Sequence, residues 1–392
     1  MESNHIIKYD DCCACGACAS QCHADAITLV PDSRGNLFPK VDETACINCG
    51  MCKSVCPCNS KISGTDTFLK TFIGYYEDED TTILSSSGGI FAAIAKHILE
   101  EGGAVFGAAA VYENNKLLIK HIRIENDSEL KKIQGSKYVH SLTQEVFSEV
   151  RDLLTSGRTV LFSGTSCQVM ALRTFLGKDY KQLYTVDLVC HGVPENLLLD
   201  AYISYLEHKW KCRIIDIAFR NKKAPSFATT KDSYVLTLKC ENIKTGSTET
   251  RYIEKYKSAY YKLFLSRACY RENCYSCPYA TLDKPSDITL GDFRPTASEY
   301  ETMVLSKDKV YSSILVHTKK GEALLSSIPG QTIPLIEISQ DKMREHHYNL
   351  VRPSVISPEG KRLAKMYQTT GFSGLQFYVD IYGTVKRIMK KM

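Results

Sequence analysis

The sequence predicts a protein of mixed α+β and α/β class, with a small cysteine-rich N-terminal domain followed by a larger mixed-sheet domain. Three observations predict this class. Eight cysteines form two identically spaced runs within the first 60 residues. Strand-like and helix-like segments then alternate, as in proteins with a partly parallel sheet. Later strand-like segments follow one another without helices, which indicates an antiparallel or mixed section. A length of 392 residues favours two or three domains.

The composition is that of a globular protein, with 44% hydrophobic and 24% charged residues. The net charge of +5 is too small to indicate a nucleic-acid partner, and a phosphate or flavin pocket would account for part of it. No apolar run reaches the ~18 residues of a membrane helix, and the N-terminus lacks the pattern of a secretion signal. We therefore expect a cytoplasmic protein, without a membrane partner, whose 17 cysteines are metal ligands or redox groups rather than disulfides.

The first 60 residues contain a repeated cysteine pattern. Residues 12–22 read CCACGACASQC and residues 46–56 read CINCGMCKSVC, so C-x2-C-x2-C-x3-C occurs twice. This is the spacing of a two-cluster ferredoxin, in which three cysteines of each run bind one [4Fe–4S] cluster and the fourth binds the other. A pair of structural zinc sites is the alternative, and it fits the spacing less well. The predicted ligands are Cys12, Cys15, Cys18 and Cys56 for the first cluster, and Cys46, Cys49, Cys52 and Cys22 for the second.

The two runs carry further signals. Gly16 and Gly50 stand where the backbone must turn tightly around a cluster. Cys13 and Cys58 stand beside predicted ligands, and the pattern gives neither of them a role. Residues 59–67 have the composition of a linker to the next domain.

The body of the protein alternates strand-like and helix-like segments. Apolar residues at helical spacing over 90–99 and 146–154 predict two helices, each ended by glycine. The strands expected around them are TFLKTFIGYY, AVFGAAAVY, TVLFSG and LYTVDLVCHG, and TSCQVMALRTFLG is a further turn and helix. The later strands CRIIDIAFR and SYVLTLKC form the antiparallel or mixed section.

Two segments have the composition of an anion-binding loop. The residues SSSGG at 85–89 precede a helix, and Ser163-Gly164-Thr165 lies between a strand and a helix. Small residues at a helix N-terminus let the backbone approach a phosphate or flavin closely. A plain capped helix is the alternative for each segment, and neither matches G-x-G-x-x-G or a P-loop.

Four cysteines of the body form a second candidate set. Cys167 and Cys190 each follow a predicted strand, so neighbouring parallel strands would bring them to the same edge of the sheet. Cys274 and Cys277 form a C-x-x-C motif. The four thiolates would hold a third cluster. The alternative is two buried cysteines beside a zinc or redox C-x-x-C site, and the spacing leaves both open.

Six motifs of the body occur in a fixed order between about residue 65 and at least residue 295: SSSGGIFAAIAKHILEEGGAVFGAA, QGSKYVHS, VLFSGTSCQVMAL, LYTVDLVCHGVP, ENCYSCPYA and DITLGDFR. In this order they resemble the coenzyme F420 hydrogenase/dehydrogenase beta-subunit family, which itself resembles a plant reductase of 7-hydroxymethyl chlorophyll a. The resemblance implies an FAD-containing catalytic domain with its own [4Fe–4S] cluster. The ligands that it implies are Cys167, Cys190, Cys274 and Cys277.

The resemblance also implies flavin-contacting residues. Small residues and N–H donors suit the FAD pyrophosphate, and a lysine can compensate phosphate charge or stabilise reduced flavin. Lys137 and His191 are the candidate catalytic residues; a solvated surface lysine and a structural histidine are the alternatives. Asp292 would orient the site or cap a turn. The expected flavin contacts are Ser86, Ser87, Gly88, Gly89, Gly135, Ser136, Lys137, Ser163, Gly164 and Thr165.

We divide the chain into residues 1–62, a two-cluster ferredoxin-type domain; 63–150 and 151–320, the N- and C-terminal parts of the flavoprotein region; and 321–392, a helical segment. Phe377, Ile381, Val385 and Met389 fall on one face of a C-terminal helix. Packing against the core or against another subunit, as in a homo-oligomer, is preferred for this face over docking to a membrane. Cys212, Cys240 and Cys269 are expected to be small buried hydrophobes.

These features predict an iron–sulfur flavoprotein oxidoreductase that moves electrons between ferredoxin-type clusters and FAD, for hydride chemistry on a small organic substrate. Coenzyme F420 is one candidate substrate. A ferredoxin or a dehydrogenase or hydrogenase subunit would be the electron donor or acceptor protein. The alternative is a non-catalytic electron-transfer subunit of a hydrogenase/dehydrogenase complex.

Overall fold

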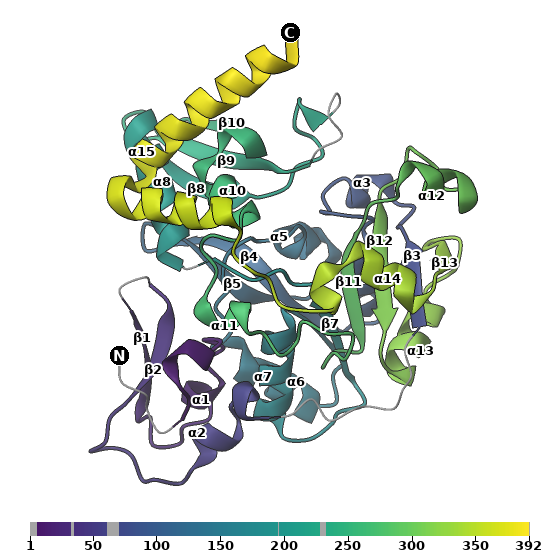
Figure 1. The fold of residues 1–392 in the computed structure, drawn as a ribbon. Coiled ribbons are helices and arrows are strands. Elements are labelled where there is room, and N and C mark those ends of the chain that lie inside the picture. Colours follow the sequence, from purple (N-terminus) through teal and green to yellow (C-terminus); the bar gives the residue numbers. More distant parts are fainter. Residues whose placement is uncertain (1–5, 33–34, 61–69, 195, 228–232, 392) are drawn as a thin grey trace.

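The structure, a computed structural model, describes residues 6–32, 35–60, 70–194, 196–227 and 233–391, with the backbone alone for 382–391. The described residues form sheets of two, three and eight strands. Figure 1 shows the N-terminal residues as a small lobe, the eight-stranded sheet beside it, and the three-stranded sheet with the C-terminal helix above them. The predicted class, α+β and α/β with a small N-terminal domain, is confirmed.

The two cysteine runs of the N-terminal domain share a backbone conformation as well as a sequence pattern. Gly16 and Gly50 have φ angles of 80° and 74°, and each is followed by one turn of helix. Because L side chains rarely adopt a positive φ, glycine permits both turns. A hairpin separates the two halves. The elements are η1 (Tyr9–Asp11), α1 (Ala17–Ser20), β1 (Ile27–Pro31), β2 (Leu37–Val41), α2 (Met51–Ser54) and η2 (Pro57–Asn59).

The two repeats differ in their surroundings. A Cβ atom added to Gly16 would lie 2.7 Å from Cβ of Gln144, whereas one added to Gly50 would meet nothing within 4 Å. The Thr143 hydroxyl donates a hydrogen bond of 2.8 Å to the carbonyl of Cys15. The first cysteine run is therefore packed against the body, while the turn of the second run is open.

One eight-stranded sheet forms the body, in the order β13-β3-β12-β11-β7-β6-β4-β5. The pairs β4–β6, β6–β7 and β7–β11 are parallel, and the other pairs are antiparallel. The alternation of strands and helices therefore predicts the parallel centre correctly. The strands are β3 (Lys70–Gly74), β4 (Ala104–Glu113), β5 (Lys116–Ile124), β6 (Val160–Ser163), β7 (Leu183–Leu188), β11 (Ile288–Phe293), β12 (Tyr311–Val316) and β13 (Leu335–Glu337).

Four strands of this sheet, β5, β11, β12 and β13, are absent from the strands that the sequence predicts. Because β13 pairs with β3, the segment 321–392 is not purely helical but contributes an edge strand to the sheet. The same pairing joins the predicted parts 63–150 and 321–392 in one sheet. The predicted linker at 59–67 falls almost entirely outside the described residues.

Helices cover both faces of the sheet, since successive side chains of a strand point to opposite faces. Val105 and Leu161 pack with α4, α5 and α13 on one face, and Phe106 and Phe162 pack with α6 and α7 on the other. The helices of this region are α3 (Glu79–Thr82), α4 (Ile90–Glu100), η3 (Asp127–Glu129), α5 (Leu130–Ile133), α6 (Val146–Thr155), α7 (Ser166–Leu176), α12 (Ala297–Thr302), α13 (Lys319–Ser327), α14 (Gln340–His346) and η5 (Tyr348–Leu350).

A three-stranded antiparallel sheet, β10-β9-β8, forms the upper part of Figure 1 and confirms the predicted antiparallel section. Cys212 and Cys240 are buried in its core, as expected of small hydrophobes, and Cys269 is half-buried beside it. The elements are α8 (Asn196–Trp210), β8 (Cys212–Ala218), β9 (Val235–Asn242), β10 (Thr248–Glu254), η4 (Lys255–Lys257), α10 (Ala259–Leu265), α11 (Glu272–Tyr275) and α15 (Pro358–Lys391).

The C-terminal helix α15 packs through a different face from the predicted one. Leu375 and Val379 are buried against the three-stranded sheet, whereas Phe377 and Ile381 are exposed. The side chains of the other two residues of the predicted face lie outside the described part. Phe377 and Ile381 therefore do not join the core of this chain. Among the described helices, none is both long and apolar enough to cross a membrane.

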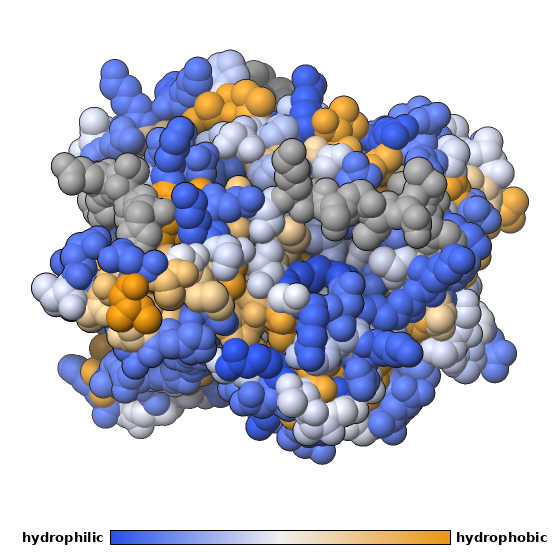
Figure 2. Space-filling view, turned by 90° about the horizontal axis from the view of Figure 1, so that it is seen from below, coloured by the Kyte–Doolittle hydropathy of each residue, from blue (hydrophilic) through white to orange (hydrophobic). Residues whose placement is uncertain are grey.

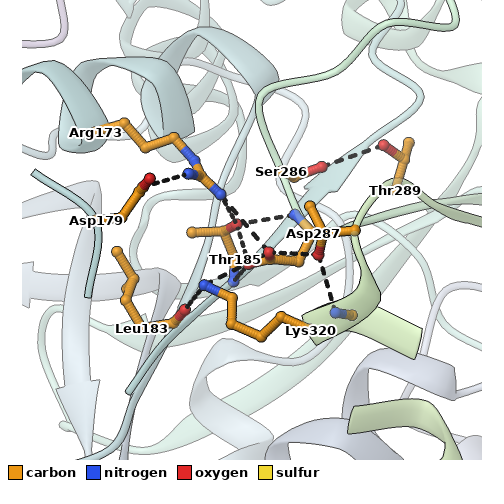
Figure 3. Close-up of polar contacts among 10 residues, drawn as sticks. Arg173, Asp179, Leu183, Thr185, Ser286, Asp287, Thr289 and Lys320 are labelled. Atoms are coloured by element: carbon orange, nitrogen blue, oxygen red, sulfur yellow. Dashed lines mark hydrogen bonds and ion pairs between the residues drawn. The ribbon is translucent and has the colours of Figure 1, made fainter. Parts of the chain in front are cut away.

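A buried carboxylate joins β7 to β11 at the sheet edge where both strands begin (Figure 3). Asp287 is 1% exposed, and its Oδ2 accepts hydrogen bonds from the backbone and the hydroxyl of Thr185 at 2.8 and 2.7 Å. Its Oδ1 lies 3.7 Å from Arg173 and 3.6 Å from Lys320. The Thr318 hydroxyl also donates a hydrogen bond of 2.8 Å to Asp287 Oδ1. The charge is thus paired and hydrogen-bonded, as burial of a carboxylate requires.

Replacing Asp287 with alanine is expected to lower the free energy of unfolding by about 3 kcal/mol, because two cations and three hydrogen-bonding groups lose their shared partner. The midpoint of urea unfolding measures this change. Asp179 is the matched control, since it pairs with the same Arg173 but has a 94% exposed side chain. Asp179→Ala is expected to change the midpoint little. Equal effects of the two variants would contradict the assignment.

Candidate functional site

One cavity of about 210 Å³ opens where the parallel strands β6, β7 and β11 end. This is the edge at which open α/β sheets form ligand sites, because the loops that leave neighbouring strands diverge there. The loops before α4, after α5 and before α7 line the cavity together with the loop after β7 and the α11 region. Segments far apart in the sequence therefore converge on one space.

Nine of the ten predicted flavin contacts line this cavity, and Gly88 does not. The backbone N–H of Gly88 donates a hydrogen bond of 2.9 Å to Ser312 Oγ. A Cβ atom at this position would lie 2.7 Å from the carbonyl oxygen of Val310. Gly88 therefore allows the loop to pack closely against β12, and it contributes no surface to the cavity.

The loop before α4 is held in place by its own side chains. Ser86 Oγ accepts a hydrogen bond of 2.7 Å from the backbone N–H of Ser136, and Ser87 Oγ donates one of 2.8 Å to the carbonyl of Tyr311. The Lys222 ammonium donates to the carbonyl of Ser87 at 2.5 Å. These hydroxyls are engaged within the protein, so the loop would present mainly backbone groups to a ligand.

His121 fixes the loop before α7, and the sequence motifs do not reveal this role. Its Nε2 lies 2.8 Å from the carbonyl oxygen of Ser163, and its Nδ1 lies 2.9 Å from Ser141 Oγ. Burial lowers the pKa of His121 to about 4, so the ring is neutral at pH 7 and its Nε2–H donates to Ser163. Thr165 and Gln168 close the N-terminus of α7 as a capping box.

The four cysteines of the second candidate set line the same cavity. Cys167 lies in the first turn of α7, Cys190 follows β7, and Cys274 and Cys277 come from α11 and the residues after it. Burial raises the pKa of Cys274 to about 12 and that of Cys277 to about 11, and the nearby Cys167 thiol adds to both shifts. The structure thus brings together thiols that are up to 110 residues apart, between Cys167 and Cys277.

The first N-terminal ligand set is also close together. Burial raises the pKa of the Cys12 thiol to about 12, and Cys15 adds to the shift. Burial and then Cys15 and Cys12 raise the pKa of Cys18. A hydrogen bond with Cys58, burial and then Cys15 raise the pKa of Cys56. The four predicted ligands of the first cluster therefore lie within electrostatic reach of one another.

The second N-terminal set is nearer to solvent. Burial raises the pKa of Cys52, and Cys49 and Cys46 add to the shift. Cys49 is exposed, and Cys22 packs against an apolar cluster that contains Cys52. Among the described residues, no group of three or more His, Cys, Asp or Glu side chains that could hold a metal ion is formed. The assignment of ligands therefore rests on spacing, burial and proximity.

Lys137 and His191, the two candidate catalytic residues, both line the cavity. The Lys137 ammonium donates a hydrogen bond of 2.7 Å to the carbonyl of Gln134, and burial lowers its pKa to about 7. His191 is exposed, although desolvation of its ring lowers its pKa. Asp292 also lines the cavity and forms an ion pair with the buried Arg220.

Two buried residues of the cavity wall have no counterpart among the sequence-based candidates. His140, 4% exposed, has no hydrogen-bond partner at either ring nitrogen within the described structure, although it lies in the QGSKYVHS motif. Arg271 is 5% exposed and lies between the cavity and the N-terminal domain. The sequence feature that could have indicated Arg271 is its position, three residues before the C-x-x-C motif.

Comparison with known proteins agrees with the six-motif resemblance. The family description "Coenzyme F420 hydrogenase/dehydrogenase, beta subunit N-term" matches residues 71–148, and the corresponding description of the C terminus matches residues 157–340. The coenzyme F420-dependent sulfite reductase of Methanocaldococcus jannaschii is 27% identical over 194 residues, which is 50% of this chain and 30% of that protein. An F(420)H(2) dehydrogenase subunit of Methanosarcina mazei is 22% identical over 249 residues, which is 61% of this chain and 69% of that protein.

Among solved structures, a chain of the F420-reducing [NiFe] hydrogenase complex from Methanosarcina barkeri is similar, with a TM-score of 0.44 and 16% identity over 77% of this chain and 90% of that chain. The two matching descriptions are those of a hydrogenase/dehydrogenase beta subunit, and this chain spans 30% of the sulfite reductase that it matches. The chain belongs to the coenzyme F420 hydrogenase/dehydrogenase beta-subunit family. The matched residues begin at 71, so the N-terminal cysteine runs lie outside the family match.

Proposed function

We propose that this protein is an iron–sulfur flavoprotein oxidoreductase, with two ferredoxin-type [4Fe–4S] clusters, a third cluster and FAD. One observation carries the proposal: the four body cysteines and the three small-residue loops line a single cavity at the edge of the parallel strands. When bound, the clusters would carry single electrons, and FAD would exchange two electrons with an organic substrate as hydride.

Converging thiols support the third cluster. Cys167, Cys190, Cys274 and Cys277 are half-buried and meet at the cavity from three separate parts of the chain. Desolvation raises the pKa of Cys190, Cys274 and Cys277, which disfavours their charged thiolates unless a cation or cluster compensates them. A hydrogen bond with Cys13 lowers the pKa of Cys167. The twofold C-x2-C-x2-C-x3-C spacing supports the two N-terminal clusters.

Three loops and a lysine support a flavin. Gly135 has a φ of 77°, and Gly164 presents no side chain to the cavity, so the backbone is accessible at both positions. Lys137 supplies a cation for a phosphate or for anionic reduced flavin, and the exposed His191 lines the same cavity, where a substrate would reach it. In this proposal Lys137 and His191 are the residues that contact the reacting groups.

The names of the sequence relatives support a deazaflavin substrate and a protein partner. Both relatives are described by their use of F420, and one of them is named as a subunit of a dehydrogenase. We therefore propose coenzyme F420 as the organic substrate and a dehydrogenase or hydrogenase subunit, or a ferredoxin, as the electron partner. The exposure of Cys49 supports a second cluster site near the surface, where such a partner would bind. Figure 2 shows that the surface seen from below, where the N-terminal lobe lies in Figure 1, is largely hydrophilic with scattered apolar areas.

Protein purified without oxygen tests the proposal through its iron content and its acid-released flavin. About 12 iron atoms per chain and one FAD are expected, since each of three clusters holds four irons. About 8 iron atoms would remove the third cluster from the proposal. The absence of releasable flavin would overturn the enzyme assignment and favour an electron-transfer subunit. Reduction of F420 by the loaded protein, compared with reduction of NAD(P)+, tests the substrate.

A further inference from the structure

The first N-terminal cluster site touches the third cluster site directly. Cys13, which neighbours the predicted ligand Cys12, lines the main cavity and packs in one apolar cluster with Cys15 and Cys167. Cys58 packs against the same cluster. The two cysteines that the spacing leaves without a role therefore fill the contact between the two sites.

Arg271 lies at this junction and is held from both sides. Its guanidinium donates hydrogen bonds to Asn36 Oδ1 at 2.8 Å and to the carbonyl of Cys12 at 3.3 Å. Its own carbonyl accepts the backbone N–H of Cys274 at 2.9 Å. It lines the main cavity and also a small pocket beside Cys12. One residue therefore contacts a predicted ligand of each cluster.

The charge of Arg271 has no carboxylate partner within ion-pair distance among the described residues. Its acceptors are neutral, and its buried Nε has no hydrogen-bond partner in the described structure. A buried cation without a counter-charge is costly. The contrast with Arg220 is direct, because that buried arginine is paired with Asp292. In the described structure, the buried Asp32 is linked to Arg271 through Asn36. A loaded site would therefore supply the negative charge that Arg271 does not contact directly.

A four-thiolate [4Fe–4S] centre is an anion and becomes more negative when it is reduced. Net charge and hydrogen bonds near a cluster are among the factors that set its reduction potential. Burial raises the pKa values of Cys12 and Cys274, and the charge of Arg271 acts in the opposite direction on both. The guanidinium is therefore within electrostatic reach of both cysteine sets.

We propose that Arg271 is a positioning residue that stabilises the reduced forms of the first N-terminal cluster and of the third cluster, and thereby raises both reduction potentials. The proposal rests on the proposed function, since it requires both clusters. A purely structural role, holding the N-terminal domain against the body, is the competing explanation. In the proposal the positive charge of Arg271 sets the two potentials, whereas in the structural explanation its hydrogen bonds hold the N-terminal domain in place.

The test compares Arg271→Gln, which removes the charge, with Arg271→Lys, which keeps it. Potentials are followed by EPR-monitored redox titration of the anaerobically purified full-length protein. In R271Q both potentials are expected to fall by about 59 mV, a tenfold change in the one-electron equilibrium constant. R271K is expected to remain near the wild-type potentials. Arg213→Gln, which removes a half-exposed cation in the three-stranded sheet, is the control and should leave both potentials unchanged.

Iron content separates failure of this inference from failure of the proposed function. Wild-type protein with fewer than about 12 iron atoms contradicts the proposed function itself. With iron complete, unchanged potentials in R271Q overturn the role of Arg271, and an equal fall in R271Q and R271K assigns it to structure instead. If R271Q loses iron, Arg271→Met is used as the second neutral variant. Loss of iron in both neutral variants but not in R271K would show that the positive charge at this position is needed to hold the clusters.

Discussion

The Cys274→Ala and Cys277→Ala variants are each expected to lose about four of about 12 iron atoms while keeping the N-terminal clusters, because a [4Fe–4S] centre depends on its thiolates. The two residues come from one short segment, α11 and the residues after it, whereas Cys167 and Cys190 follow separate strands. The double variant removes this segment's entire contribution to the site. It is therefore expected to be free of the third cluster even if a single variant retains a partial one.

The measurement is iron and acid-labile sulfide per chain after purification without oxygen. Cys269→Ala is the matched control, because Cys269 precedes the same segment and packs against the same apolar cluster as Cys274 but does not line the cavity. It is expected to keep all the iron. Unchanged iron in the double variant would rule out the ligand assignment. Equal loss in Cys269→Ala would mean that iron is lost through general disruption of this loop.

The cysteine sets of this protein are easiest to predict from sequence where the predicted ligands are close in the chain. The N-terminal runs are readable because three predicted ligands of each cluster fall within seven residues, and the structure repeats the same turn at Gly16 and Gly50. Cys167 and Cys190 are also readable, since each follows a strand and parallel strands end at one edge. The C-x-x-C pair is linked to them only by the family resemblance.

The remaining features depend on contacts between distant segments. His121 contacts Ser163 from β5, which β4 separates from β6, and Lys222 holds a loop more than 130 positions before it. No local spacing marks such pairs. Strand β13 has three residues and no distinctive pattern of its own, and it becomes a strand by pairing with β3. Arg271 stands three positions before the C-x-x-C motif, but no spacing marks its contacts with Asn36 and Cys12 of the N-terminal domain.

Binding of FAD to flavin-depleted protein is expected to be about tenfold weaker at pH 8 than at pH 6. Burial lowers the pKa of Lys137 to about 7, so the side chain is largely protonated at pH 6 and largely neutral at pH 8. The FAD pyrophosphate remains anionic across this range, and it would be attracted only to the protonated form. The affinity therefore falls as the pH rises through 7.

Calorimetric titration with FAD, without oxygen, measures the affinity at both values of pH. Lys137→Arg keeps its charge throughout and should bind equally well at pH 6 and pH 8, because arginine is not deprotonated in this range. Lys137→Met should bind weakly at both. If the methionine variant kept the wild-type pH dependence, another group of the cavity would be responsible. His121 is unsuited to that role, because its lowered pKa of about 4 keeps it neutral at both values. Because the charge of Lys137 is lost near pH 7, proton uptake by this lysine is linked to flavin binding. A surface lysine would stay charged at both pH values and would show no such link.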